Sequence, residues 1–218
     1  TDYDNTTTTL NDVTANFIDN VALERNAQGA WIHAKRYNWP SDGSKLAFFA
    51  YYPYDAERVQ VKDVAGPMQF DYEMPATDGV VNAADQGDLM ACGVKDLTHN
   101  NSANVVLPLR HALTAVKFVL DNDNVVPGVI KSVSFEHVYR KSSYTVGNIV
   151  DGVDYGWNHT NAVVADAITY SYGTGFDTTD KENNNLTPDA ATFLMIPQSF
   201  TSDDQLISVV INDGVQDY

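Results

Sequence analysis

The chain has 218 residues, and its 13 lysines and arginines against 29 aspartates and glutamates give a formal net charge of −16. Such an acidic chain is repelled by nucleic acid and by anionic lipid, so neither is expected as a partner. Hydrophobic residues make up 44% of the chain, which excludes intrinsic disorder, and no apolar run approaches the roughly 20 residues that span a bilayer.

The first half of the chain is predicted to be a series of short strands. Residues 1–12 are mostly Thr, Asn and Asp and predict a mobile arm, while residues 13–31 hold short apolar runs separated by turn residues at hairpin spacing. Leu46 to Tyr52 predicts a strand with aromatic side chains on both faces, which needs cover on both. Alternation over residues 70–74 and the apolar run at residues 88–92 predict two further strands.

The longest apolar run, Val105 to Leu120, is predicted to lie in the core. Its apolar residues alternate in one phase up to Leu113 and in the opposite phase from Val116, so a strand here needs a bulge or a bend. Helical spacing also fits, with Pro108 opening the helix. We favour a strand because β-branched residues dominate both ends of the run and no capping pattern precedes it.

The strongest break in the chain follows this run. Asp121 to Asn124 and the pair Pro127-Gly128 predict loops, and we place there a boundary between two domains, residues 1–125 and 126–218. Beyond it, residues 129–138 alternate with one slip. Further short strands are predicted at residues 143–149, 192–196 and 206–211. Outside the ambiguous run no segment shows a clear helical stripe, so the chain is predicted to be mostly β, with a sandwich architecture.

The C-terminal residues predict an unfinished hairpin. Asp213-Gly214 follows the alternating strand at residues 206–211 and is a strong hairpin signal, yet only four residues come after it. We expect either that residues have been removed or that another chain supplies a strand, which is the logic of β-augmentation. The candidate strand-acceptor edge consists of Leu206, Ile207, Val209 and Ile211.

Signals for catalysis and metal binding are weak. The five histidines include no pair at i, i+4, no serine lies in a nucleophile motif, and Cys92 has no partner for a disulfide or a structural zinc. A carboxylate pair serves glycoside hydrolysis, but 29 acidic residues offer many pairs by chance. The loops Asp2 to Asn5 and Asp121 to Asn124 offer oxygen ligands for calcium without EF-hand order, and solvated turns explain them better. No catalytic, cofactor-binding or metal residue is predicted, and the chain is not expected to be an enzyme.

A group of aromatic residues offers an alternative function. Tyr51, Tyr52 and Tyr54 lie close together in the sequence, and Trp39 precedes them. Tyrosine and tryptophan present flat faces with polar tips, which stack on sugar rings, although core and edge packing is their commoner role. The alternative is therefore a glycan-binding β-sandwich module at the cell surface.

Five short motifs follow one another between about residues 30 and 211. They are Tyr37–Pro40 (YNWP), Leu46–Pro53 (LAFFAYYP), Asp88–Ala91 (DLMA), Leu107–Leu113 (LPLRHAL) and Phe193–Gln198 (FLMIPQ). In this order they resemble the motifs of fimbrillin-like (Mfa-like) subunits, which are surface lipoproteins and pilus components of Gram-negative anaerobes of gut and mouth.

The resemblance implies an all-β chain of tandem transthyretin-like β-sandwich domains, the second incomplete here, and no enzyme or cofactor. It implies assembly into a fimbrium by strand donation between subunits, so the expected partners are other fimbrial subunits, with host or bacterial glycans or proteins as adhesion ligands. The expected location is the cell surface, in an extracellular fimbria attached to the outer membrane by a lipid anchor absent from this chain, since Cys92 is not a lipobox cysteine. The signature core positions implied are Trp39, Phe48, Phe49, His111 and Leu113.

Overall fold

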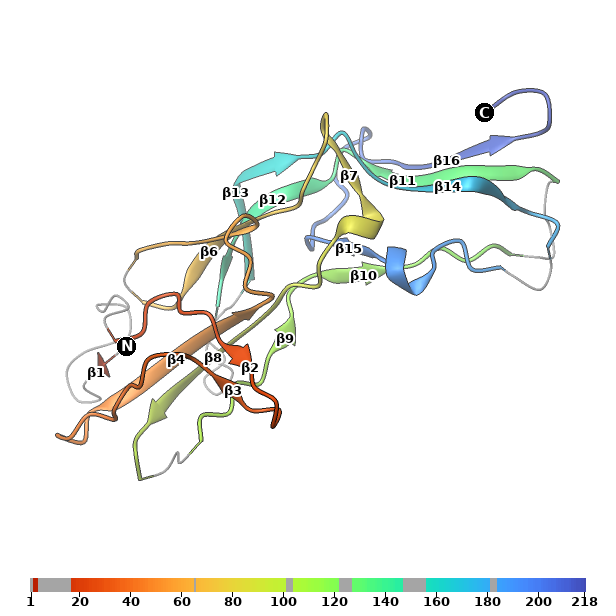
Figure 1. The fold of residues 1–218 in the computed structure, drawn as a ribbon. Helices are drawn as coiled ribbons and strands as arrows, with labels where there is room; N and C mark the ends of the chain where they lie inside the picture. Colours follow the sequence, from red (N-terminus) through yellow and green to blue (C-terminus); the bar gives the residue numbers. More distant parts are fainter. Residues whose placement is uncertain are drawn as a thin grey trace. The chain divides into compact units, whose positions relative to one another are not determined.

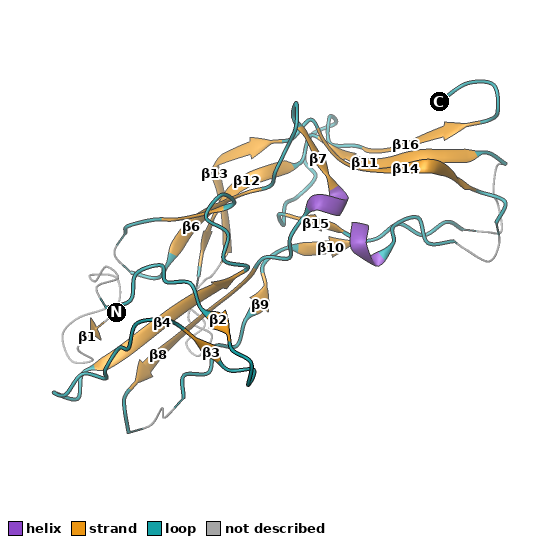
Figure 2. Ribbon diagram, viewed as in Figure 1, coloured by secondary structure: helices purple, strands orange, loops and turns teal. Residues whose placement is uncertain are grey.

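The fold is known from a computed structural model, which describes residues 2–3, 17–64, 66–100, 104–121, 127–146, 156–180 and 184–218 (Figure 1). Strands dominate it. The helices of the described residues are single short turns, η2 (Ala83–Asp85) and η3 (Asp189–Ala191) (Figure 2). The prediction of an all-β chain is therefore confirmed.

The chain forms two compact units, and each unit is built from three segments of the sequence. Unit 1 holds Thr1–Asp71, Leu89–His111 and Ser143–Asn158. Unit 2 holds Tyr72–Asp88, Ala112–Ser142 and His159–Tyr218. The boundary predicted between residues 125 and 126 lies outside the described residues and stays a prediction.

Unit 1 is built on an antiparallel sheet of order β1-β4-β8-β9. Its strands are β1 (Asp2–Tyr3), β4 (Lys45–Tyr52), β8 (Met90–Leu97) and β9 (Arg110–His111). In β4 and β8, Phe48 lies opposite Val94 and Tyr51 opposite Ala91. A separate small hairpin is formed by β2 (Glu24–Arg25) and β3 (Trp31–Ile32). The strand predicted at residues 46–52 is confirmed by β4.

A third sheet, of order β13-β12-β6-β5, supplies the aromatic centre of unit 1. Its strands are β5 (Val59–Val61), β6 (Gln69–Glu73), β12 (Tyr139–Thr145) and β13 (Gly156–Val164), and residues of the last three belong partly to each unit. Phe70 of β6 is fully buried, and its ring centroid lies 5.9 Å from that of Tyr51 and 5.3 Å from that of Tyr144. The alternation predicted for residues 70–74 is confirmed, because Phe70 and Tyr72 are buried and their neighbours are not.

Unit 2 is built on a sheet of order β16-β11-β14-β7. Its strands are β7 (Val80–Asn82), β11 (Val129–Glu136), β14 (Ala167–Asp177) and β16 (Ile207–Asn212). β11 is antiparallel to both its neighbours, and its register shifts between Ile130 and Ser132. This irregularity accounts for the slip in the alternation of the sequence, because a bulge adds one residue to a strand. Gly175 has a φ of +84°, and a Cβ there would collide with the side chain of Val129.

Three phenylalanines form the core of unit 2. The antiparallel pair of β10 (Thr114–Val116) and β15 (Phe193–Met195) brings Phe193 over the large sheet. The ring of Phe193 meets Phe118 edge-on at 5.5 Å and Phe135 edge-on at 5.3 Å. Phe193 has no exposed surface, and Phe135 is 4% exposed. β15 therefore packs against the large sheet at Phe135, near the end of β11.

The run from Val105 to Leu120 is not one core strand. It contains β9 in unit 1 and β10 in unit 2, with the buried residues Ala112 and Leu113 between them. The preference for strand over helix is confirmed, and the break between β9 and β10 accounts for the change of phase. The prediction that the whole run is core is wrong, because the side chain of Val106 is 74% exposed and that of Val119 is 63% exposed.

Candidate functional site

The strand β16 lies at one end of its sheet and has a strand partner, β11, on one side (Figure 1). The N–H of Glu136 donates to the carbonyl of Leu206 at 2.9 Å, so residue 206 faces β11. Ile211 instead exchanges two hydrogen bonds with Tyr218 on the opposite side. Because successive residues of a strand direct their backbone groups to alternate sides, Ile207 and Val209 present their N–H and carbonyl groups to the outer edge. Among the described residues, no strand pairs with that edge at these two positions.

Side chains of β16 lie on the same face of the sheet as buried side chains of β11, but they are exposed. Ile207 lies opposite Phe135 and Val209 opposite Val133, and residues directly opposite each other share a face. Phe135 and Val133 are 4% and 0% exposed, whereas Ile207 and Val209 are 57% and 39% exposed. Phe200, which contacts the Phe135 ring at 6.1 Å, is also exposed. We call Phe200, Ile207 and Val209 the open apolar face.

The predicted hairpin at Asp213-Gly214 is present. Asn212 pairs with Asp217, Gly214 has a φ of +94°, and the Asp213 carboxylate accepts the N–H groups of Val215 and Gln216. These hydrogen bonds, the one from Gln216 foremost, hold the pKa of Asp213 below its ordinary value. The returning chain pairs with the outer edge of β16 at Ile211.

The two-stranded sheet of β10 and β15 in unit 2 has an outer edge, at β15, that a side chain occupies. The side-chain amide of Gln86 donates from Nε2 to the carbonyl of Leu194 and accepts the Leu194 N–H at Oε1, both at 2.9 Å. A glutamine amide carries the same donor and acceptor as a peptide group. Gln86 therefore occupies the position at which a neighbouring strand would pair with β15.

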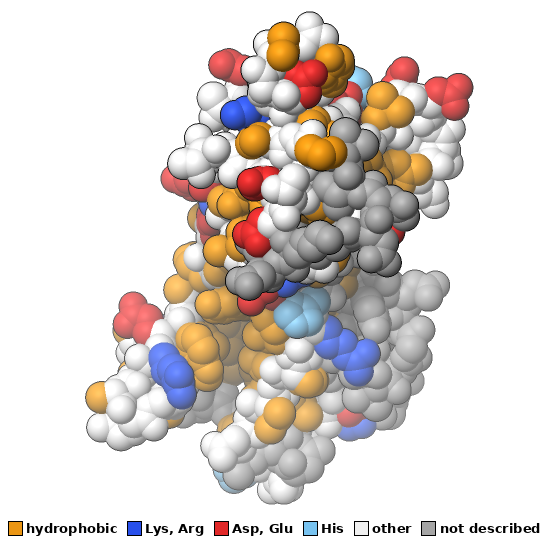
Figure 3. Space-filling view, turned by 90° about the vertical axis from the view of Figure 1, so that its right-hand side faces the viewer, with side chains coloured by type: hydrophobic (Ala, Val, Ile, Leu, Met, Phe, Trp, Pro, Cys, Tyr) orange, Lys and Arg blue, Asp and Glu red, His pale blue; other side chains and the backbone are white. Residues whose placement is uncertain are grey.

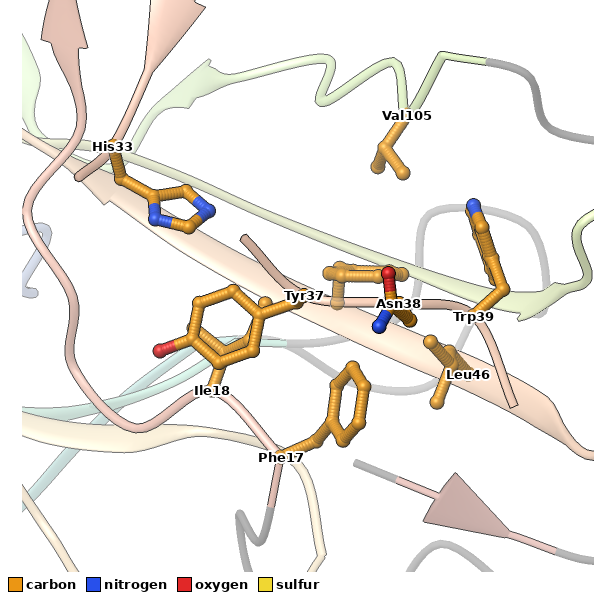
Figure 4. Close-up of a pocket in the computed structure, with 9 residues that line it drawn as sticks. Phe17, Ile18, His33, Tyr37, Asn38, Trp39, Leu46 and Val105 are labelled. Carbon is orange, nitrogen blue, oxygen red and sulfur yellow. The ribbon is translucent and has the colours of Figure 1, made fainter. Parts of the chain in front are cut away.

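An aromatic hollow of about 170 Å³ lies in unit 1, with His33 and Trp39 at opposite ends and Tyr37 and Phe17 between them (Figure 4). The Tyr37 ring lies 5.7 Å from that of Phe17 and 4.9 Å from that of His33. The Trp39 ring meets Phe48 edge-on at 6.1 Å. These contacts hold the aromatic rings in place without a ligand.

A second hollow, of about 570 Å³, shares Tyr37, Asn38 and Trp39 with the first. The rest of its lining is mostly hydroxyl and amide side chains from two segments, among them Ser41, Ser44, Thr98 and Asn100. An apolar hollow and a polar one thus share one stretch of wall, formed by these three adjacent residues.

The predicted signature core residues do not share one environment. Leu113 is buried, at 8% exposed, while Trp39, Phe48 and Phe49 are half-buried. His111 is exposed, so its expected place in the core is wrong. It lies in the two-residue strand β9 opposite Met90, at the end of the sheet order.

The aromatic group predicted around Tyr51 divides into separate contacts. Tyr51 stacks on Tyr54 at 6.1 Å and donates its hydroxyl to Asn20. Burial, followed by the neighbouring Tyr54, raises the pKa of Tyr51. Trp39 packs against Phe48 instead. The sequence placed Tyr37 and Trp39 in one motif but gave no sign that Phe17 and His33 would line the same hollow.

Other candidate chemistry finds little support in the described residues. Within them, no group of three or more His, Cys, Asp or Glu side chains could hold a metal, and most of the two Asx-rich loops lies outside them. His159 shares a hydrogen bond with the buried Ser142 at 2.9 Å and stacks on Tyr139, which accounts for its position by packing. Burial raises the pKa of the Cys92 thiol to about 11. No helix of the described residues is both long and apolar enough to cross a membrane.

On the face drawn in the space-filling view, hydrophobic side chains gather near the middle, and others are scattered among acidic, basic and uncharged groups (Figure 3).

Two solved structures resemble this one. A fimbrial protein from Bacteroides vulgatus matches over 93% of this chain and 76% of its own length, with a TM-score of 0.65 and 16% identity. A putative cell adhesion protein from Bacteroides ovatus matches over 87% of this chain and 63% of its own, with a TM-score of 0.46 and 14% identity. At such identities, the first likeness indicates a shared fold.

A search of curated proteins gives no match. The family model described as fimbrillin-like matches residues 2–218, nearly the whole chain. That match agrees with the order of the five motifs in the sequence and with the all-β fold. The chain belongs to the fimbrillin-like family.

Proposed function

We propose that this chain is a fimbrial subunit or adhesin of the cell surface, and that it joins a neighbouring subunit by accepting a strand along the outer edge of β16. Membership of the fimbrillin-like family supports the fimbrial role, and the expected partners are other subunits of the same or a related kind. Attachment to the outer membrane through a lipid anchor stays a prediction.

The observation that carries the proposal is the open apolar face beside an unpaired edge. An added strand would bond the outward N–H and carbonyl groups of Ile207 and Val209. The apolar side chains on one face of the added strand would pack beside Ile207 and Val209, which are 57% and 39% exposed. Full burial of an aliphatic side chain contributes about 1.5–3 kcal/mol, and each backbone hydrogen bond about 0.5–1.5 kcal/mol. The two terms favour the same partner, an extended segment with alternating apolar residues.

The test is a proline placed where it blocks the edge and spares the fold. The N–H of Val209 faces away from β11, so Val209→Pro removes no hydrogen bond to β11 but denies one to an added strand. Val209→Thr keeps the N–H and the β-branched shape and serves as the matched control. Self-association is followed by light scattering and by unboiled denaturing gels, before and after proteolytic trimming of the N-terminal residues.

We expect wild type and Val209→Thr to form oligomers that resist the detergent, and Val209→Pro to stay monomeric with a melting temperature close to that of wild type. Oligomers of Val209→Pro as abundant as those of wild type would overturn acceptance at β16. A wild type that stays monomeric under both conditions would exclude polymerisation through its own copies and leave the role of a terminal adhesin.

A further inference from the structure

Trp39 belongs to the lining of two hollows of opposite character in unit 1. The 170 Å³ hollow is lined by rings and aliphatic groups, including Tyr37, Phe17 and Leu46. The 570 Å³ hollow is lined largely by amide and hydroxyl groups. A cavity of about 150 Å³ holds one six-membered ring, and ligand pockets commonly fall in the range of about 300–1,000 Å³. The two hollows together have the size of a site for a ring with polar extensions.

The residues that line the two hollows indicate whether a ligand there would be charged or neutral. Among the described residues that line the two hollows there is no lysine, arginine, aspartate or glutamate, and the whole chain carries a net charge of −16. A charged ligand would therefore find no opposite charge in this lining, and the neighbouring Lys35 ammonium lies over the Tyr37 ring. Asn38, Ser41 and Thr98 offer neutral donors and acceptors instead. The ligand that matches is uncharged and rich in hydroxyl groups.

The aromatic rings of the site are held in place by contacts with their neighbours before any ligand binds. Tyr37 is held between Phe17 and His33, and the Lys35 ammonium lies 4.8 Å from the centre of its ring. His33 accepts the N–H of Lys35 at Nδ1, which leaves the proton on Nε2 available for donation. Side chains that are ordered before binding lose less entropy on binding.

From this arrangement we propose a binding site for a neutral saccharide, with the apolar face of one pyranose ring against Trp39 and its hydroxyl groups directed toward Asn38 and the polar hollow. Tyrosine and tryptophan suit such a ring because each pairs a flat apolar face with a polar tip. The site is separate from β16, so it stands or falls independently of strand acceptance.

The experiment is a screen of the full chain on an array of neutral and acidic glycans, followed by titration of tryptophan fluorescence with cellotetraose, maltotetraose, chitotriose and lacto-N-tetraose. Trp39→Ala removes the stacking surface. Trp31→Ala is the matched control, because Trp31 is a 60% exposed tryptophan that lines neither hollow. Asn38→Ala changes an exposed polar group of the wall and keeps the test valid should Trp39→Ala fail to fold.

We expect a neutral saccharide to bind wild type and Trp31→Ala with affinities within about twofold of each other. Trp39→Ala should weaken binding by roughly tenfold or more, and Asn38→Ala by about three- to tenfold. The site is overturned if none of the four saccharides binds at millimolar concentration and the array is blank. It is equally overturned if only acidic glycans bind, or if Trp31→Ala loses binding while Trp39→Ala keeps it.

Discussion

Replacing Phe193 with alanine tests whether the three phenylalanines hold unit 2 together. Phe193 has no exposed surface, and its ring makes edge-on contacts with Phe118 and Phe135. Truncation of a buried phenylalanine to alanine costs about 3–5 kcal/mol, and each aromatic contact contributes about 0.5–1.5 kcal/mol beyond the buried area. We therefore expect Phe193→Ala to lower the free energy of unfolding by about 4 kcal/mol, in the middle of that range.

The assay is urea denaturation followed by far-UV circular dichroism and by tryptophan fluorescence. All three tryptophans, Trp31, Trp39 and Trp157, lie in unit 1, so their fluorescence follows that unit, while the dichroism follows the whole chain. The dichroism midpoint of Phe193→Ala should fall by at least about 1 M urea. Phe193→Leu, which keeps an apolar side chain in place, should lose about half as much. A loss below about 1.5 kcal/mol for the alanine variant would refute the core assignment.

Three further outcomes follow from single contacts. The hydrogen bond from Lys141, at 2.8 Å, holds the pKa of Glu73 below its ordinary value. The stability that the ionised Glu73 contributes is therefore present at neutral pH and is lost as pH falls through that lowered pKa. Melting temperatures of Glu73→Gln should depend less on pH between about pH 5 and pH 3 than those of wild type. Gln86→Leu leaves both backbone groups of Leu194 without their partner and should cost about 2–4 kcal/mol in urea denaturation, whereas Gln86→Glu, which still accepts the N–H, should cost less. The Cys92 thiol, buried and with its pKa raised to about 11, should react with Ellman's reagent at pH 8 far more slowly in the folded chain than in urea; equal rates would show that the thiol is accessible.

Features that repeat every two residues could be predicted from the sequence, because a strand buried on one face leaves that period in its side chains. The alternation of β16 and the slip in β11 are both visible in the sequence, and both appear in the structure. The hairpin at Asp213-Gly214 was equally predictable, because its glycine takes a positive φ.

Whether a face is covered could not be predicted. Ile207 and Phe135 lie opposite each other and look alike in the sequence, yet one is exposed and the other buried. Alternation reports which residues share a face, and it contains no information about a second layer above it. The same gap explains His111, whose neighbours in the sequence suggested a core that does not cover β9.

The two hollows could not be predicted either, because their lining comes from distant segments. Phe17, Trp39 and Val105 are far apart in the chain and meet at the first hollow through the tertiary fold. The sequence reading grouped Trp39 with Tyr51, Tyr52 and Tyr54, whereas in the structure Trp39 packs against Phe48 and lines the first hollow with Tyr37.

The return of the chain at Asn212 to Asp217 would affect any strand that joined the outer edge of β16. Since Tyr218 takes the outward groups of Ile211, such a strand would end beside Val209 or displace the hairpin. A slide of one residue would turn the polar face of that strand toward the open apolar face, so slides of two are the smallest tolerated. The hairpin would thus stop an accepted strand beside Val209 and fix its register along β16. A segment of suitable composition but two residues too long would have to open the Asp213-Gly214 turn before it could seat fully.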